Sequence, residues 1–393
     1  MTYRILSLDG GGSWALLQAM ALKEIYKDRP QGNKCKTILT DFDLIIANSG
    51  GSLMLAAMIE KDTIDEVIFL FLDEQIRKSI FSDLGFWKRS WTEKLVSMIN
   101  FGPKYSTVKK IEGIRRALPV YGTEAFDNIA SKLGIDTKFM IMGFDYDRQR
   151  AVYFRSYQSS NSSSSDNSVQ LSQAVHASSN APLMYFDEPA LFSYQGYQRR
   201  FWDGAVGGNN NPCLVGVIEA MAQGIKHENI ELRSIGTGNV SLPLRGQTLY
   251  NKYQFPYLGQ NPDSRNLKTD IKKMAGSILS EPPDVATYVS HIILGGLPAG
   301  GSKPRVVRLN PLIQPYLDNN KQWIVPPDFK TEFFEKLIGL DMDAVEQDDV
   351  NYISYLGAMW LADKVHNQPI RMSMDDFTCQ IGHKVFSEGK KDW

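Results

Sequence analysis

The feature that most constrains the fold is a pattern that occurs twice in the first sixty residues. An apolar segment, residues 4–8, ends in the turn 9–12 (Asp-Gly-Gly-Gly), and helical spacing of apolar residues follows over 14–26. A second apolar segment, residues 42–47, ends in the turn 48–52 (Asn-Ser-Gly-Gly-Ser) and is again followed by helical spacing. Strand, Gly-rich turn and helix, repeated in that order, predict parallel strands joined by helices. We therefore expect an α/β fold with a central, mostly parallel sheet flanked by helices.

Composition and charge exclude several classes of protein. The 393-residue chain has 43 Lys and Arg against 44 Asp and Glu, so its net charge is −1. A dedicated nucleic-acid binder usually has a basic excess, so a nucleic acid polymer is not an expected partner. No segment approaches the ~20 consecutive apolar residues of a transmembrane helix, and the N-terminus lacks the apolar stretch of a signal peptide. We expect a cytoplasmic protein that meets a membrane only peripherally.

The cysteines and histidines give no metal or disulfide pattern. Cys35, Cys213 and Cys379 lie far apart, and no CxxC pair occurs. A disulfide framework and a zinc site are therefore not expected. Because no His, Cys, Asp and Glu have the spacing of metal ligands, we propose neither a metal nor a cofactor from the sequence.

The second Gly-rich turn carries a candidate nucleophile, Ser49. A serine between a strand and a helix, with small neighbours, fits the nucleophile elbow G-x-S-x-G, in which the hydroxyl is held forward above the sheet. Here Ala47 takes the place of the first glycine, while Gly51 keeps the second. Ser52 competes, but Met54 follows it where the pattern needs glycine. A phosphate-binding turn is the alternative interpretation.

The first Gly-rich turn predicts an anion site. Consecutive glycines before a helix can point several backbone N–H groups into one concavity, so Gly10, Gly11 and Gly12 could stabilise an oxyanion. The stretch 10–15 also matches the dinucleotide pattern G-x-G-x-x-A, which needs an acidic residue about 20 positions later at a strand end. Asp28 has that spacing but lies at a predicted helix end, so an oxyanion loop is favoured.

Asp203 is the candidate base. It follows the apolar pair Phe201-Trp202 and precedes Gly204-Ala205, so it could take a proton from a serine without crowding. A turn-capping aspartate is the alternative. A Ser–Asp–His triad would need a histidine after Asp203. The sequence has five histidines, His176, His227, His291, His366 and His383. The last four follow Asp203 and could numerically complete a triad.

Five motifs, taken in order, resemble the patatin-like phospholipases over roughly residues 3–240. They are Asp9-Gly10-Gly11-Gly12, the turn around Ser49, Ala177-Ser178-Ser179-Asn180-Ala181-Pro182, Asp203-Gly204-Ala205 with Asn209-Asn210-Asn211-Pro212, and Ser234-Ile235-Gly236-Thr237-Gly238. The resemblance implies a patatin-like fold and a Ser–Asp dyad. Ser49 would be the nucleophile, Asp203 its base, and Gly10, Gly11 and Gly12 the oxyanion donors, with no cofactor.

Two departures from the family pattern stand close to these motifs. Ala47 replaces the first glycine of the elbow, and Trp14 and Ala15 stand where the family usually has Arg or Lys and then Gly. The missing cation bears on rate and on substrate choice more than on the type of reaction.

We expect two regions, a catalytic core over residues 1–240 and a mainly helical region over 241–393. The second region would pack on the core as a lid, an oligomer contact or a regulatory element. Apolar stripes over 329–337 and 353–361 predict helices within it. The polar run 158–168 is expected to be a loop, and the aromatic-rich stretch 68–91 either core or a membrane-contacting face.

The predicted activity is that of a phospholipase A, which cleaves fatty-acyl esters of membrane phospholipids. Its setting is either housekeeping or a regulated membrane-degrading effector, like the patatin-like toxins and the nucleotide-activated antiviral phospholipases of bacteria. An activating nucleotide or protein partner and a homo-oligomer belong to the second hypothesis. The alternative is a weakly active or inactive lipid-binding protein of the same fold, against which the intact Ser49 and Asp203 argue.

Overall fold

The computed structural model describes residues 2–84, 103–158, 169–182, 185–241, 283–296, 303–320, 323–373 and 378–393. Within them, one eight-stranded sheet has the order β5-β6-β3-β2-β1-β7-β9, and β4 pairs with β3. Its strands are β1 (Tyr3–Leu8), β2 (Leu44–Ala47), β3 (Lys138–Asp145), β4 (Arg150–Arg155), β5 (Ala190–Tyr194), β6 (Tyr197–Asp203), β7 (Ile230–Ile235) and β9 (Val306–Leu309).

The centre of this sheet is parallel. The pairs β3–β2, β2–β1, β1–β7 and β7–β9 all run in the same direction. Leu8 pairs with both Ala47 and Ile235, so β1, β2 and β7 end level with one another. Strands β4, β5 and β6 are antiparallel additions at one side. The Gly-rich turns therefore share one edge of the sheet.

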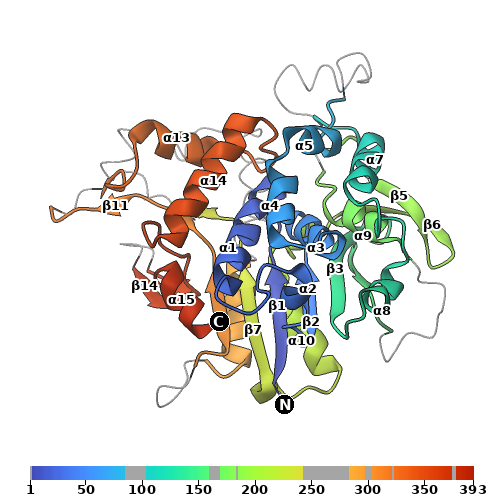
Figure 1. Cartoon of the computed structure of the whole chain (residues 1–393), viewed down its shortest axis with the longest axis horizontal. Coiled ribbons are helices and arrows are strands. Elements are labelled where there is room, and N and C mark those ends of the chain that lie inside the picture. The colour runs from blue at the N-terminus through green and yellow to red at the C-terminus, as the bar shows by residue number, and fades with distance from the viewer. Residues whose placement is uncertain are drawn as a thin grey trace, which may run out of the picture.

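Helices cover both faces of the sheet (Figure 1). Those described are α1 (Leu16–Tyr26), α2 (Cys35–Leu39), α3 (Gly50–Glu60), α4 (Ile64–Leu72), α5 (Glu74–Ile80), α7 (Thr107–Ala117), α8 (Ile129–Leu133), α9 (Leu171–Ser178), α10 (Cys213–Ala222), α13 (Thr331–Gly339), α14 (Gln347–Leu361) and α15 (Phe386–Asp392). The short elements are η1 (Gly12–Ala15), η3 (Phe126–Asn128), η4 (Gly204–Gly207), η5 (His227–Asn229), β8 (Asn239–Val240), β10 (Leu312–Ile313), β11 (Tyr316–Leu317), β12 (Trp323–Ile324), β13 (Arg371–Met372) and β14 (Cys379–Ile381).

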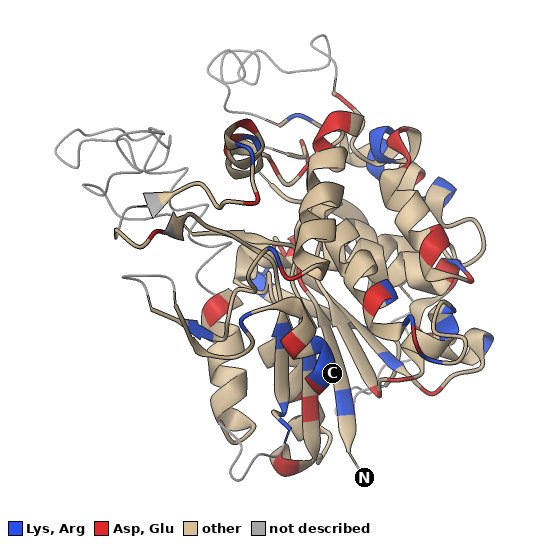
Figure 2. Cartoon of the chain, turned by 60° about the vertical axis from the view of Figure 1, so that its left-hand side comes forward, with Lys and Arg blue, Asp and Glu red and all other residues tan. Residues whose placement is uncertain are grey.

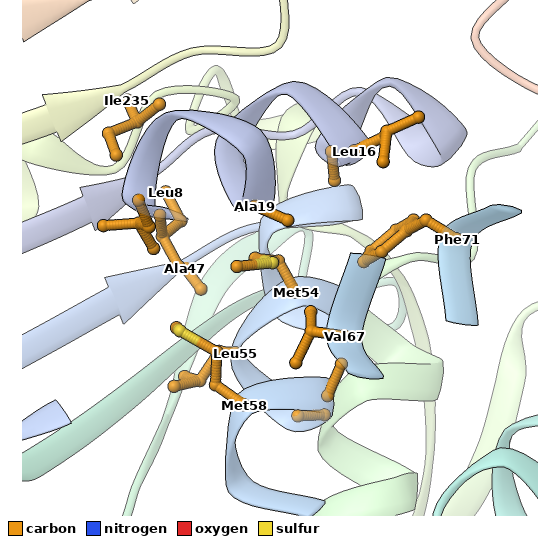
Figure 3. Packing of buried hydrophobic residues seen from close by; sticks show 14 of the residues in the cluster. Leu8, Leu16, Ala19, Ala47, Met54, Leu55, Met58, Val67, Phe71 and Ile235 are labelled. Carbon is orange, nitrogen blue, oxygen red and sulfur yellow. The ribbon is translucent and has the colours of Figure 1, made fainter. Parts of the chain in front are cut away.

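The strands alternate between two hydrophobic cores. In β1, Ile5 belongs to the core beneath α10, whereas Leu6 and Leu8 belong to the larger core on the opposite face. Side chains of a strand point alternately to the two faces of a sheet, so a strand buried on both faces is apolar at most of its positions. In Figure 3, Leu8, Ala47 and Met54 meet where β1, β2 and α3 converge, directly beneath the Gly-rich turns.

The predicted α/β architecture is confirmed, including helices in the C-terminal region. The two apolar stripes predicted there lie largely on α13 and α14, where Phe334, Leu337, Ile353 and Trp360 are buried. Strand β9 was not predicted, and it joins the main sheet beside β7, so the regions on either side of residue 240 share one sheet.

Two predicted segments extend beyond the described residues. Of the stretch 68–91, the described part forms the end of α4, all of α5 and a short turn to residue 84; Phe86, Trp87 and Trp91 lie outside. Of the polar run 158–168, only Gln158 is described.

The residue composition is reflected in two properties of the structure, the distribution of charged residues and the apolarity of the helices. Figure 2 shows acidic and basic residues interspersed over the described helices and loops, without one face of a single sign. Among the described helices, none combines the length and apolarity that crossing a membrane requires.

Candidate active site

Ser49 occupies a sharp turn between β2 and α3. Its backbone has φ +48° and ψ −119°, a conformation that a non-glycine residue rarely adopts. The Ser49 N–H donates to Ser178 Oγ at 2.9 Å, which anchors the turn to the end of α9. This is the strained strand-to-helix geometry of a nucleophile elbow, and it leaves Ser49 partly exposed.

The competing serine is excluded by its position. Ser52 lies inside α3, is fully buried, and donates its hydroxyl to the Ser49 carbonyl at 2.6 Å. It therefore fixes the turn and is not accessible to a substrate.

The departure at Ala47 is explained by packing. Ala47 is the last residue of β2, and its methyl group lies in the large core beside Leu8 (Figure 3). The two glycines that follow Ser49 have no such space. A Cβ on Gly50 would lie 2.5 Å from the Gly12 nitrogen, and one on Gly51 would lie 2.3 Å from the Leu8 carbonyl oxygen. The tight approach of the two turns therefore depends on Gly50 and Gly51.

Asp203 reaches Ser49 because β6 ends near the end of β2. Asp203 pairs with Gly143 of β3, two residues beyond the Ile141 that pairs with Ala47. The carboxylate is almost fully buried, and the Ser49 side chain is close enough to lower its pKa. The structure thus brings the two predicted residues into contact across more than 150 positions of sequence.

The Asp203 carboxylate is held by two further donors. Asn48 Nδ2 donates to Oδ1 at 3.0 Å, and the Ala205 N–H donates to the same oxygen at 2.9 Å. Burial raises the pKa of Asp203, while the hydrogen bonds from Ser49, Ala205 and Asn48 and the charge of Lys110 oppose that rise. A carboxylate with a raised pKa is a stronger base than one at the surface.

The glycine loop lies against the elbow. A Cβ on Gly10 would be 2.9 Å from Ser49 Cβ, and Gly12 has φ +55°, a left-handed conformation that favours glycine. The Gly10 N–H already donates to the Asn210 carbonyl at 2.8 Å, so it is engaged in this conformation. The N–H groups of Gly11 and Gly12 make no hydrogen bond within the described part of the chain. Of the three predicted donors, Gly11 and Gly12 are the ones with free amides.

A segment of the C-terminal region covers this loop. Ser13 N–H donates to the Met342 carbonyl at 3.1 Å, and Trp14 Nε1 donates to the Asp341 carbonyl at 3.0 Å. Lys104 Nζ lies 2.9 Å from an Asp341 carboxylate oxygen and 3.1 Å from one of Asp343. Trp14, which departs from the family pattern, is therefore an anchor for residues 341–343.

An apolar cavity opens beside the same loop. It is partly open to solvent, and apolar side chains form most of its wall. Leu53, one helical turn after Ser49, is part of its wall. The lining residues are Gly12, Ser13, Leu53, Ala56, Ala57, Leu70, Phe71, Ile76, Arg77, Ile80, Phe81, Ile114, Ala117 and Leu118. Such an apolar lining is typical of a site for an apolar ligand.

Sequence reasoning missed four residues that shape the site: Asn48, Ser178, Lys110 and Asn180. Asn48 and Ser178 stand inside recognised motifs, but their side-chain roles depend on partners far along the chain. Lys110 is fully buried near Asp203 and lies on an amphipathic helix next to the exposed Lys109, so no local signal separates the two lysines.

The alternatives to a Ser–Asp pair find no support in the described residues. No described histidine hydrogen-bonds Ser49 or Asp203, and His176 on α9 offers its backbone carbonyl to Lys110. Asp28 is exposed at the end of α1, away from any strand end, which removes the dinucleotide interpretation. No group of three or more His, Cys, Asp or Glu within the described residues could hold a metal ion.

A mixed sheet between helices, with a strained serine at one strand end and a buried aspartate beside it, is an arrangement that serine hydrolases of the α/β class share. The family model for patatin-like phospholipases matches residues 6–216, more than half of the chain. The chain belongs to the patatin-like phospholipase family. The family supports lipid hydrolysis as the general activity.

Comparison with solved structures adds two distant likenesses. VipD from Legionella pneumophila is 8% identical, with 91% of this chain and 67% of VipD covered at a TM-score of 0.38. The type III effector protein ExoU is 10% identical, with 75% of this chain and 54% of ExoU covered at a TM-score of 0.25. The chain thus spans about half the length of ExoU. Comparison with curated proteins gives no match.

Proposed function

We propose that the protein is a phospholipase A type lipid acyl hydrolase that uses Ser49 as its nucleophile and Asp203 as its base. The observation that carries this proposal is the position of Ser49, on a strained strand-to-helix turn beside the buried Asp203 carboxylate. A buried carboxylate in contact with the hydroxyl can accept its proton without an imidazole.

In the proposed reaction, Ser49 Oγ attacks the ester carbonyl while Asp203 accepts the hydroxyl proton. The carbonyl oxygen becomes an oxyanion, which the free amides of Gly11 and Gly12 would stabilise. Collapse of the tetrahedral intermediate breaks the ester bond, and protonated Asp203 returns its proton to the departing lysophospholipid oxygen. Water, deprotonated by Asp203, then attacks the acyl-serine, and release of the fatty acid regenerates Ser49.

The apolar cavity supports a lipid as the substrate. Its wall includes Gly12 at the glycine loop and Leu53 one turn from Ser49, so an acyl chain in the cavity would have its carbonyl close to both groups. Burial of apolar chain stabilises binding by about 0.8 kcal/mol per CH₂. Substrate at a membrane surface would make the protein a peripheral membrane enzyme in the cytoplasm.

The decisive experiment measures fatty-acid release from mixed phospholipid vesicles by wild type, Ser49→Ala and Asp203→Ala. The proposal expects release by wild type and loss of more than about 10³-fold in both variants. Ser52→Ala is the matched control and should keep most of the activity. Equal release by wild type and Ser49→Ala would contradict the proposed nucleophile.

The wider role we propose is a regulated membrane-degrading effector in antiviral defence. The contacts of residues 341–343 with the glycine loop support a regulatory C-terminal region, because any ligand that moved this segment would change the surroundings of Gly12 and Ser13. Vesicle hydrolysis measured with and without a panel of cyclic nucleotides tests this role. Full activity without any added ligand would favour a housekeeping hydrolase, and vesicle binding without hydrolysis would favour the lipid-binding alternative.

A further inference from the structure

Among the described residues, no carboxylate directly contacts the buried lysine that lies behind the candidate dyad. Lys110 on α7 is fully buried, and its ammonium makes two long hydrogen bonds, to the His176 carbonyl at 3.4 Å and to Asn180 Oδ1 at 3.5 Å. Its Nζ also lies 4.1 Å from the centre of the Phe186 ring. A buried cation with only neutral partners is costly, so its presence calls for a compensating charge nearby.

The Asp203 carboxylate is the charge that favours the ammonium form of Lys110. Burial lowers the pKa of Lys110 well below its usual range, and the Asp203 carboxylate opposes this shift. The surrounding elements carry His176 on α9, Asp187 before β5 and Arg77 on α5; Glu74 and Lys78, also on α5, pair with each other at the surface. Burial lowers the pKa of His176; Asp187 accepts the Thr107 N–H, and Arg77 donates to the Val345 and Phe71 carbonyls.

Asn180 joins the lysine to the aspartate. Its Oδ1 faces Lys110, its Nδ2 donates to the Glu188 carbonyl at 2.7 Å, and its own carbonyl accepts the Asp203 N–H at 3.0 Å. Lys110 is therefore tied to the same backbone segment as Asp203 but forms no direct ion pair with it. The carboxylate oxygens stay available to Ser49, Asn48 and Ala205.

We propose that Lys110 is a positioning residue for the Ser49–Asp203 pair, whose buried ammonium keeps Asp203 ionised without occupying the carboxylate oxygens that Ser49 needs. This inference rests on the proposed function, since it assumes that Asp203 acts as the base. It assigns a purpose to a buried charge that packing alone would disfavour.

The test compares the pH dependence of Ser49 reactivity in wild type and Lys110→Met. The rate of labelling by a fluorophosphonate is measured from pH 4 to pH 9, beside fatty-acid release from phosphatidylcholine vesicles. Loss of the cation raises the pKa of Asp203, so the acid limb of both profiles should move to higher pH. Lys110→Arg keeps a positive charge and should keep the wild-type limb, and Lys109→Met, which changes the exposed neighbour, is the matched control.

The outcomes separate this inference from the proposed function. A lower rate in Lys110→Met with an unchanged acid limb would reduce Lys110 to a packing residue and overturn the proposal. Fluorophosphonate labelling with the expected shift but no lipid hydrolysis would support Lys110 and contradict the phospholipase activity. If Lys110→Met does not fold, as judged by thermal unfolding, Asn180→Ala provides the second variant. It loosens the lysine from the Asp203 segment, and an acid limb identical to wild type would also overturn the proposal.

Discussion

Two buried carboxylates lie at the same edge of the sheet, and each has a buried cation near it. Asp9 follows β1 and makes a direct ion pair with Arg308 of β9 at 2.5 Å. Asp203 ends β6, and its cation, Lys110, is held by neutral oxygens without a direct ion pair. The two sites share burial and charge, and they differ in the contact between the charges.

Because of this difference, we assign a role in stability to the Asp9–Arg308 pair and a role in the reaction to Asp203 and its neighbour Lys110. In the first pair, Arg308 occupies an Asp9 carboxylate oxygen and also donates to Ser234 Oγ at 2.8 Å, which links β9, β7 and β1. In the second, the carboxylate accepts from Ser49 and stays able to gain a proton. A guanidinium does not lose its proton in proteins, whereas a buried lysine can. The Asp9 side should therefore govern stability and the Asp203 side activity.

The largest expected effect tests the Asp203 side. Asp203→Asn should reduce kcat/KM by more than about 10³-fold, because the amide cannot take the Ser49 proton. The fold should persist, since the amide oxygen can keep the hydrogen bonds from Asn48 and Ala205, and Lys110 can neutralise by losing a proton. Kinetics on vesicles together with thermal unfolding check both statements. Activity of Asp203→Asn within tenfold of wild type would contradict the role in the reaction that the comparison gives to Asp203.

The next effect tests the Asp9 side. Asp9→Asn should lower the free energy of unfolding by about 3–5 kcal/mol, because it leaves the Arg308 guanidinium buried and uncompensated. Urea unfolding measures this value. The double variant Asp9→Asn with Arg308→Met removes both charges and should regain part of the loss. A loss below about 1 kcal/mol in the single variant would show that the pair is not structural.

A smaller effect concerns the loop that follows Asp9. Gly12→Ala should destabilise the protein by about 3 kcal/mol, because the residue has φ +55° and its Cβ would lie 2.4 Å from the Met342 carbonyl oxygen. Gly224→Ala is the matched control: it has φ +87° and nothing within 4 Å of the added Cβ. It should cost only the backbone strain, about 1 kcal/mol. Equal losses of stability in the two variants would mean that residues 341–343 move away from the added methyl group without a measurable change in the free energy of unfolding.

The sequence was sufficient for features that depend on neighbouring residues. The parallel strands β1 and β2, the turn at Ser49 and the glycine loop follow from apolar runs and from small residues within a few positions. Asp203 was predicted as a strand-end carboxylate, and the resemblance to the family linked it to Ser49. These features are local because strand ends, turns and helix starts are determined by backbone conformation.

Features that depend on distant partners were not predictable in this way. Lys110 and Lys109 are the same residue type on one helix, and only the packing of α7 against α9 buries the first. Strand β9 has four residues, and its pairing with β7 spans about 70 positions, so its apolar run gave no sign of its place in the main sheet. Nothing in the sequence links Arg308 of β9 to Asp9, because the two residues are 299 positions apart and meet only in the folded sheet.

The smallest effect tests the link between Trp14 and the C-terminal region. Trp14→Phe removes the hydrogen bond from Nε1 to the Asp341 carbonyl, and should destabilise the protein by about 1 kcal/mol beyond the lost apolar area. Trp202→Phe is the matched control, because its indole N–H has no partner among the described residues, and the difference between the two variants isolates the hydrogen bond. Because Trp14 stands on the Asp9 side, urea unfolding should register the change while kcat on vesicles stays within about twofold of wild type. A large change in kcat with unchanged stability would place residues 341–343 on the chemical side of the comparison.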